Sequence, residues 1–168
     1  MTPGGFVYHV CNRGASKGRL FDCDDDYAAF ETLLTRAREK RPMRIIAYEL
    51  MSTHIHLLLW PKGDRDVPRF MQWLTGKHAQ DWHLRRGTTG SGAVYQSRYT
   101  SVGIAEIGHL INAWRYVERN ALAAGLVRRA EDWRWSSLWQ TRAERPTFML
   151  DPGPICLPAN WLDILNDL

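Results

Sequence analysis

The stretch from residue 45 to residue 61, IIAYELMSTHIHLLLWP, constrains the fold more than any other part of the chain. It consists mostly of large apolar and β-branched residues, which favour buried strands. A short polar interruption near its middle predicts an antiparallel hairpin with strands at residues 43–50 and 54–60. Two histidines, His54 and His56, lie inside the second of these strands.

These two histidines are candidate metal ligands. Successive residues of a strand point to opposite faces, so positions 54 and 56 share one face. Two imidazoles on a rigid face can bind a metal ion if another part of the chain supplies a third ligand. A strand histidine also occurs as an ordinary hydrogen-bonded residue, and the pair alone favours that second interpretation.

A second segment, LINAWRYVERNALAAGLV at residues 110–127, shifts this balance. Its apolar residues recur at helical spacing, and Gly125 is typical of a helix end, so we predict a helix over residues 106–125. Tyr116 and Asn120 are four residues apart and therefore share one face of that helix. An Asn120 amide oxygen would complete a metal site with the two histidines, and Tyr116 would stand beside it as a nucleophile.

Five motifs follow one another along the chain. They are YHVCNRG (8–14), ELMSTHIHLLLWP (49–61), GAVYQSRYTSV (92–102), YVERNALAAGLV (116–127) and DWRWSSL (132–138). In this order the motifs resemble those of the HUH transposases with one catalytic tyrosine, the IS200-like family, and within it the REP-associated tyrosine transposases. The resemblance covers residues 8–138. It implies that His54, His56 and Asn120 bind a metal ion and that Tyr116 is the nucleophile.

The resemblance also implies an activity. A transposase of this type cleaves and rejoins hairpin single-stranded DNA through a covalent 5′-phosphotyrosine link, with Mg²⁺ or Mn²⁺ and without a nucleotide cofactor. Consistent with the last point, the loop GTTGSG at residues 87–92 lacks the Gly-Lys-Ser/Thr of a P-loop.

Two alternatives remain open. The first is a non-catalytic protein that recognises hairpin DNA and regulates repeat elements. The second is a metal hydrolase in which His54, His56 and Asn120 activate water. The hydrolase is the weaker alternative, because Glu118 lies on a different helix face from Tyr116 and no other general base is evident.

The chain departs from the family pattern at two places. Family members usually have Pro-Asn before the first histidine, where this chain has Ser52 and Thr53. They often have Asn-Pro where this chain has Asn120 and Ala121. Alanine keeps the backbone N–H that proline lacks, so we expect the tyrosine helix to continue through residue 121.

The charge is moderately positive, with a formal net charge of +4 and a pI of about 9.1. We predict DNA contacts for Arg13, Lys77, Arg98 and Arg119, because guanidinium and ammonium groups suit phosphate oxygens. A solvated surface position explains Arg13 and Lys77 equally well. His9 is a further candidate for the site, although packing near the sheet edge is the preferred interpretation.

The remaining patterns predict a strand at residues 6–13, helices at 24–41 and 67–86, and a strand at 94–102. With the hairpin and the tyrosine helix, this order indicates an α+β, ferredoxin-like sandwich. Its antiparallel sheet has helices on one face, and the helix after the last strand carries the tyrosine.

The predicted domain spans residues 1–145, and residues 146–168 form a tail that packs on it. The tail is extended up to residue 158 and ends in a short helix.

Three cysteines, Cys11, Cys23 and Cys156, fit neither a disulfide framework nor a zinc motif. We therefore expect reduced thiols. We also expect a soluble cytoplasmic protein that associates with the nucleoid and not with a membrane. A monomer is mildly preferred over a homodimer.

Overall fold

The computed structural model describes residues 2–167. Its strands are β1 (Val7–Arg13), β2 (Arg44–Met51), β3 (His54–Trp60) and β4 (Thr100–Ile104). Its helices are α1 (Asp24–Lys40), α2 (Asp66–Arg86), α3 (Ile107–Glu118), α4 (Asn120–Ala123), α5 (Ser137–Arg142) and α6 (Trp161–Asn166), with short 3₁₀ turns η1 (Ala15–Lys17) and η2 (Ala130–Asp132).

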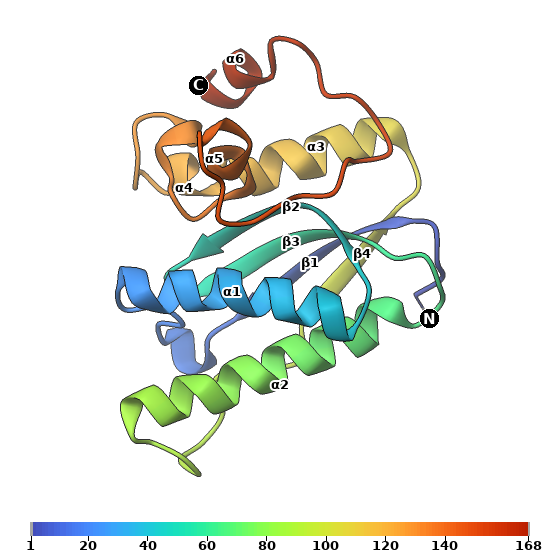
Figure 1. Ribbon diagram of the computed structural model, residues 1–168. Helices are drawn as coiled ribbons and strands as arrows, with labels where there is room; N and C mark the ends of the chain where they lie inside the picture. Colours follow the sequence, from blue (N-terminus) through green and yellow to red (C-terminus); the bar gives the residue numbers. More distant parts are fainter. Residues whose placement is uncertain (1, 168) are drawn as a thin grey trace.

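The four strands form one antiparallel sheet in the order β2-β3-β1-β4. Helices α1 and α2 cover one face, and α3 to α6 lie on the other (Figure 1). This arrangement confirms the predicted ferredoxin-like α+β sandwich, with the tyrosine helix across the sheet from α1 and α2. The strand β1 is central, because it pairs with both β3 and β4.

Apolar side chains fill both faces of the sheet. Towards α1 and α2, Ile55, Leu57 and Leu59 of β3 join a core in which all three are fully buried. Leu58 points the other way and packs under α3 against Val117. The alternation along β3 therefore places its two histidines on the α3 side, since they have the same parity as Leu58.

The strand β4 starts later than predicted. It was expected at residues 94–102 but covers Thr100–Ile104. The preceding residues are extended along the end of β1, where the Ala15 and Gln96 N–H groups donate to Val94 and Arg13 respectively. Because only an isolated bridge, Gly14 with Tyr95, joins this part to the sheet, the strand-like composition of residues 94–99 did not produce a regular strand.

The tyrosine helix is shorter than predicted. It was expected to run over residues 106–125, yet α3 ends at Glu118 and a separate turn, α4, follows. Arg119 between them has φ −108° and ψ 1°, outside the helical region. The buried Glu49 carboxylate of β2 accepts the Ala121 N–H, which satisfies the backbone where the helix is interrupted. A tertiary contact thus overrides the helix propensity of alanine.

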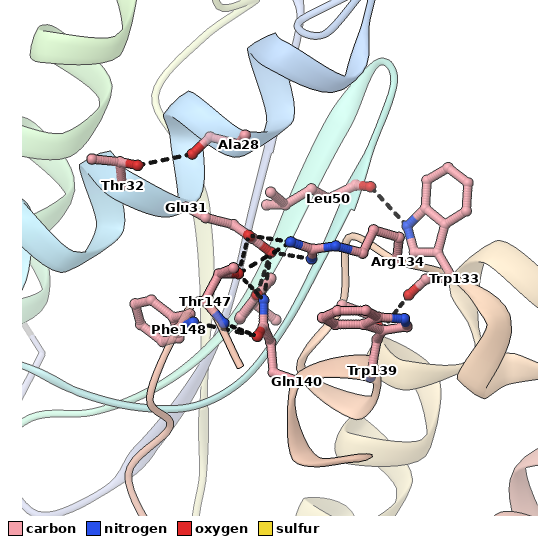
Figure 2. Close-up of polar contacts among 12 residues, drawn as sticks. Ala28, Glu31, Thr32, Leu50, Trp133, Arg134, Trp139, Gln140, Thr147 and Phe148 are labelled. Carbon is pink, nitrogen blue, oxygen red and sulfur yellow. Dashed lines mark hydrogen bonds and ion pairs between the residues drawn. The ribbon is translucent and has the colours of Figure 1, made fainter. Parts of the chain in front are cut away.

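Residues 134–147 are tied to helix α1 through the Glu31 carboxylate (Figure 2). Gln140 Nε2 and Thr147 Oγ1 each donate to it at 2.9 Å, and Arg134 forms an ion pair with it. Phe148, next to Thr147, is 2% exposed in the main core. The segment from residue 146 therefore packs on the domain, while the domain boundary at residue 145 stays a prediction.

The terminal helix α6 lies against α3. Trp161 Nε1 donates to Glu118 Oε2 at 2.9 Å, and Arg115 Nε donates to the Ile164 carbonyl oxygen at 3.1 Å. These contacts fix the outer side of the helix that carries Tyr116. None of the helices within residues 2–167 has both the length and the apolar character that a membrane crossing requires.

Candidate active site

The two histidines of β3 converge as the sequence predicts. Their ring centroids are 5.0 Å apart with an interplanar angle of 89°. His56 is buried and His54 is half-buried. Because Ile55 and Leu57 on either side of His56 are locked in the opposite core, the direction of both imidazoles is fixed by the strand.

The turn before His54 is held by its carbonyl groups. The Thr53 oxygen accepts the Gly14 N–H at 2.8 Å, and the Ser52 oxygen accepts the Leu20 N–H at 2.7 Å. Thr53 Oγ1 also lies 3.0 Å from His54 Nδ1. Ser52 and Thr53 therefore form a hairpin turn that these contacts support, and the Thr53 hydroxyl holds one nitrogen of His54.

A third histidine, His9, belongs to the same cluster. Its Nε2 lies 3.0 Å from His56 Nδ1, and the two rings stack at 5.2 Å. The preferred interpretation of His9 as packing near the sheet edge was wrong, because β1 is a central strand. In its register with β3, Cys11 lies opposite His56, so His9 points to the same face as both. The pairing of β1 with β3 is the signal that would have revealed this residue.

Burial keeps the three imidazoles neutral. It lowers the pKa of His56 to about 3, and the nearby His9, His54 and Arg13 add to the shift. Burial also lowers the pKa of His9 and His54. A neutral imidazole retains a nitrogen lone pair, which is the form that binds a metal ion.

The Nε2 atoms of both β3 histidines are the ring nitrogens left for a ligand. The Nδ1 atoms already have partners, in Thr53 and His9. His56 Nε2 is buried and has no hydrogen-bond partner in the described chain. An unpaired buried nitrogen is costly, and a bound cation would satisfy it.

Asn120 is the group that would complete such a site. Its side chain lies near His54 and opposes the lowering of the His54 pKa. Within residues 2–167 no cluster of three or more His, Cys, Asp or Glu side chains has metal-binding geometry. Metal binding by the two imidazoles and the Asn120 amide oxygen stays a prediction; such a donor set would leave coordination positions for other oxygens.

Tyr116 lies at this cluster although the helix ends two residues later. Its ring centroid is 5.3 Å from that of His56 and 5.6 Å from that of His9, with edge-to-face geometry. The side chain is 53% exposed. Tyr116 and Asn120 also line one groove of about 570 Å³ along α3 and α4, so the phenol borders open space and the histidines together.

Glu49 is a further polar residue on this face that the sequence analysis did not single out. It pairs across the hairpin with His56 and is 1% exposed. Burial raises its pKa to about 8, against the hydrogen bond from the Ala121 N–H, and the Glu118 carboxyl raises it further. Its role is structural, since it holds the chain in place at Ala121, directly after Asn120.

The four predicted DNA contacts lie in different places. Arg13 is exposed beside the histidines, and its charge acts on both His54 and His56. Arg119 lines the Tyr116 groove, but its guanidinium donates to the carbonyl oxygens of Leu165 and Asp167 at 2.8 Å each.

The other two lie away from Tyr116. Lys77 is on α2, on the opposite side of the sheet from α3, where it pairs with Asp81 at 2.6 Å. Arg98 borders a groove beside α2. The structure thus brings Arg13 and Arg119 to the site and places Lys77 and Arg98 elsewhere; contact with DNA stays a prediction for all four.

Known structures share the fold of this chain. The chain resembles a REP-associated tyrosine transposase bound to a REP hairpin, at 18% identity and a TM-score of 0.66, over 92% of this chain and 94% of that chain. It also resembles a candidate transposase from Deinococcus radiodurans, at 18% identity and a TM-score of 0.51, over 67% of this chain and 88% of that chain. A search of curated proteins found no match.

The sequence itself supplies the family. A family model described as IS200-like transposase matches residues 5–120, which is more than half of the chain. The matched region includes the clustered histidines His9, His54 and His56 as well as Tyr116 and Asn120. The chain belongs to the IS200-like transposase family.

Proposed function

We propose that this protein is a metal-dependent single-strand DNA endonuclease and ligase, and that it cleaves and rejoins hairpin DNA through a link to Tyr116. One observation carries the proposal. The centroid of the exposed Tyr116 ring lies 5.3 Å from that of His56, whose buried Nε2 has no hydrogen-bond partner within residues 2–167. A nucleophile thus lies next to a histidine with a ring nitrogen left for a ligand.

The residues have distinct roles in this reaction. His54, His56 and Asn120 would hold Mg²⁺ or Mn²⁺, and His9 orients His56. When bound, the cation neutralises the phosphate and stabilises charge on its oxygens. The Tyr116 hydroxyl attacks phosphorus, a bond from phosphorus to the tyrosine oxygen forms, and the bond to the 3′ oxygen breaks. The proton lost by the phenol balances the one gained by the released 3′ hydroxyl.

The reverse reaction rejoins the strand. The phosphotyrosine ester keeps the energy of the broken phosphodiester, so a 3′ hydroxyl from another strand can attack it without ATP. The structural relative that was solved with a REP hairpin supports a folded single strand as the substrate. We expect the reaction to occur in the cytoplasm, on DNA of the nucleoid.

The test compares wild-type protein with Tyr116→Phe on labelled hairpin oligonucleotides from repeats of the source genome, with Mn²⁺ or Mg²⁺ and with chelator. On a denaturing gel, wild type should give a labelled band shifted by the mass of the protein. Tyr116→Phe and chelator should abolish it. Tyr27→Phe is the matched control, because Tyr27 belongs to α1, on the face of the sheet away from α3.

Two outcomes would replace the proposal. Cleavage without an adduct that persists in Tyr116→Phe would favour a hydrolase. Hairpin binding without cleavage under either metal would favour a non-catalytic binder. Glu118 is poorly placed to serve the hydrolase as a base, since it is buried and accepts hydrogen bonds from Ser137 and Trp161.

A further inference from the structure

A group of basic side chains lies around the first half of α2. Two grooves, of about 640 and 440 Å³, lie on either side of that helix and share Arg69 and Gln72. We call them together the α2 groove. Five basic side chains and one carboxylate line the α2 groove. They are Lys40, Arg41, Arg65, Arg69, Arg98 and Asp66. This excess equals the net charge of +4 for the entire chain.

None of these five cations forms an ion pair within residues 2–167. Other basic residues on α1 and α2 do so: Arg38 pairs with Asp151, Lys77 with Asp81, and Arg86 with Asp26. The one acidic group of the α2 groove, Asp66, accepts the Gly63 N–H at 2.7 Å. Neighbouring basic side chains on α1 and α2 are thus paired with carboxylates, whereas the five that line the α2 groove form no ion pair within residues 2–167.

The neutral side chains of the α2 groove suit a phosphate backbone as well. Gln72 adds an amide donor to the groove, while the Thr75 and Ser97 hydroxyls, which also line it, donate to the carbonyl oxygens of Met71 and Arg98. Such donors accompany arginines where proteins hold nucleic-acid phosphates without reading base sequence. A groove of this composition favours a polyanion over an apolar ligand.

Gly76 gives an independent indication. It lies within the 21-residue helix α2 and lines the α2 groove. A Cβ at this position would meet nothing within 4 Å, and glycine weakens a helix interior relative to alanine. Since the fold has room for a side chain there, the absence of one favours close approach of an external partner to the helix backbone.

The α2 groove extends to the strand end that borders the active site. Asn12 lines it, and the Arg13 N–H donates to Asn12 Oδ1 at 3.0 Å. Arg13 lies opposite His54 in the pairing of β1 with β3. A nucleic acid in the α2 groove would thus reach the rim of the sheet next to the histidines.

We infer that the α2 groove binds the phosphate backbone of a nucleic-acid duplex, the stem of a hairpin whose unpaired strand passes Arg13 to Tyr116. This inference rests on the proposed function for the identity of the folded strand. The stem and the cleaved strand then occupy opposite faces of the sheet. Residues of the α2 groove would set the binding affinity, and Tyr116 and the histidines would carry out the chemistry.

Binding affinity at several salt concentrations tests the inference, with Tyr116→Phe protein in chelator so that no cleavage is required. Each phosphate contact to a duplex contributes about 0.9 to the slope of log affinity against log salt. The variant Arg65→Gln, Arg69→Gln, Arg98→Gln should lower the slope for a hairpin by about 3. Its slope for a stemless strand of the same unpaired sequence should not change.

The matched control removes the same charge elsewhere, as Arg128→Gln, Arg142→Gln, Arg145→Gln. These three arginines are exposed and line neither part of the α2 groove. An equal loss of slope in the control, an equal loss on the stemless strand, or an unchanged hairpin slope in the α2 groove variant would each overturn the inference. Failure of the adduct test leaves this measurement intact, so the two proposals fail separately.

A second variant tests close approach. Gly76→Leu should keep or raise the melting temperature, because leucine favours helices and the space is empty. It should weaken hairpin binding at least 10-fold while stemless binding is retained. A Gly76→Leu protein that binds the hairpin as tightly as wild-type protein does would contradict contact between the stem and the helix backbone.

Discussion

At the scale of single residues, His9 controls the state of the histidine cluster. One proton is shared between His9 Nε2 and His56 Nδ1, which are 3.0 Å apart. This contact fixes the ring of His56 and leaves its Nε2 for a ligand. Groups that orient a metal-binding histidine commonly contribute 10- to 100-fold to metal affinity or activity.

We therefore expect His9→Ala to raise the Mn²⁺ concentration for half-maximal cleavage by about 10- to 100-fold. His9→Gln should lose less, because its amide can still hydrogen-bond His56. Titrating the metal in the cleavage assay measures both. His109→Ala, at an exposed histidine of α3, is the control. A His9→Ala titration that coincides with that of wild type would show that His9 does not orient His56.

Glu49 makes stability depend on pH. Its pKa is 4.5 in a free side chain and about 8 in the folded protein, where burial is the largest cause. Between these values the folded state keeps a proton that the unfolded chain has lost. The free energy of unfolding therefore falls as pH rises through this range. Glu118 has a raised pKa as well and acts in the same direction.

Glu49→Gln should remove the Glu49 part of this dependence, because the amide oxygen still accepts the Ala121 N–H and cannot ionise. Denaturant unfolding at about pH 5 and about pH 9 should show a gain for the variant at the higher pH. One pKa unit is worth about 1.4 kcal/mol, so the gain is at most about 4 kcal/mol. Glu144→Gln, at an exposed position, should show none. Parallel pH curves for Glu49→Gln and wild type would contradict the account.

At the scale of elements, the tail beyond residue 145 is part of the folded core. Phe148→Ala should lower the free energy of unfolding by about 3 kcal/mol or more, because a buried aromatic ring is replaced by a cavity. Met149→Ala should change it by less than about 0.5 kcal/mol, since Met149 is 67% exposed against 2% for Phe148. Urea unfolding of both variants measures this. Equal effects would mean that the tail does not contribute to the core.

Elements with strong local signals were predicted well. Three aspartates and Pro42 mark the ends of α1, predicted at 24–41 and observed at Asp24–Lys40. The strand β3 was predicted with its observed ends, His54 and Trp60. Capping charges, proline and apolar alternation act within a few residues, so they are visible in a single sequence.

Features set by tertiary contacts were not predicted. The break after α3 depends on Glu49, which is 72 residues away from Ala121 in sequence. The strand β4 starts late because residues 94–99 contact the end of β1 without forming a regular ladder. His9 lies in the site because β1 pairs with β3. The sequence thus indicated the site residues that the hairpin and the tyrosine helix carry. The residues that support them, His9 and Glu49, became apparent only from the folded structure.

At the scale of the whole molecule, the sheet edges favour the monomer. The β2 edge is covered, since the Leu50 N–H donates to Trp135 and Glu49 bridges to Ser136. The other edge is β4, a strand of only five residues that contains Gly103. Short edge strands resist pairing between copies. Light scattering after size exclusion should give 19.4 kDa, and a mass near twice that value would show a dimer.

The central claim is that Tyr116 forms the covalent link to DNA, and peptide mapping of the adduct tests it most directly. After cleavage of a hairpin oligonucleotide, nuclease and trypsin digestion releases residues 116–119 as the peptide YVER, whereas Tyr99 begins the peptide of residues 99–115. Mass spectrometry should find a nucleotide phosphate on YVER alone. A nucleotide on the peptide that contains Tyr99, or cut DNA without any modified peptide, would contradict the assignment of Tyr116.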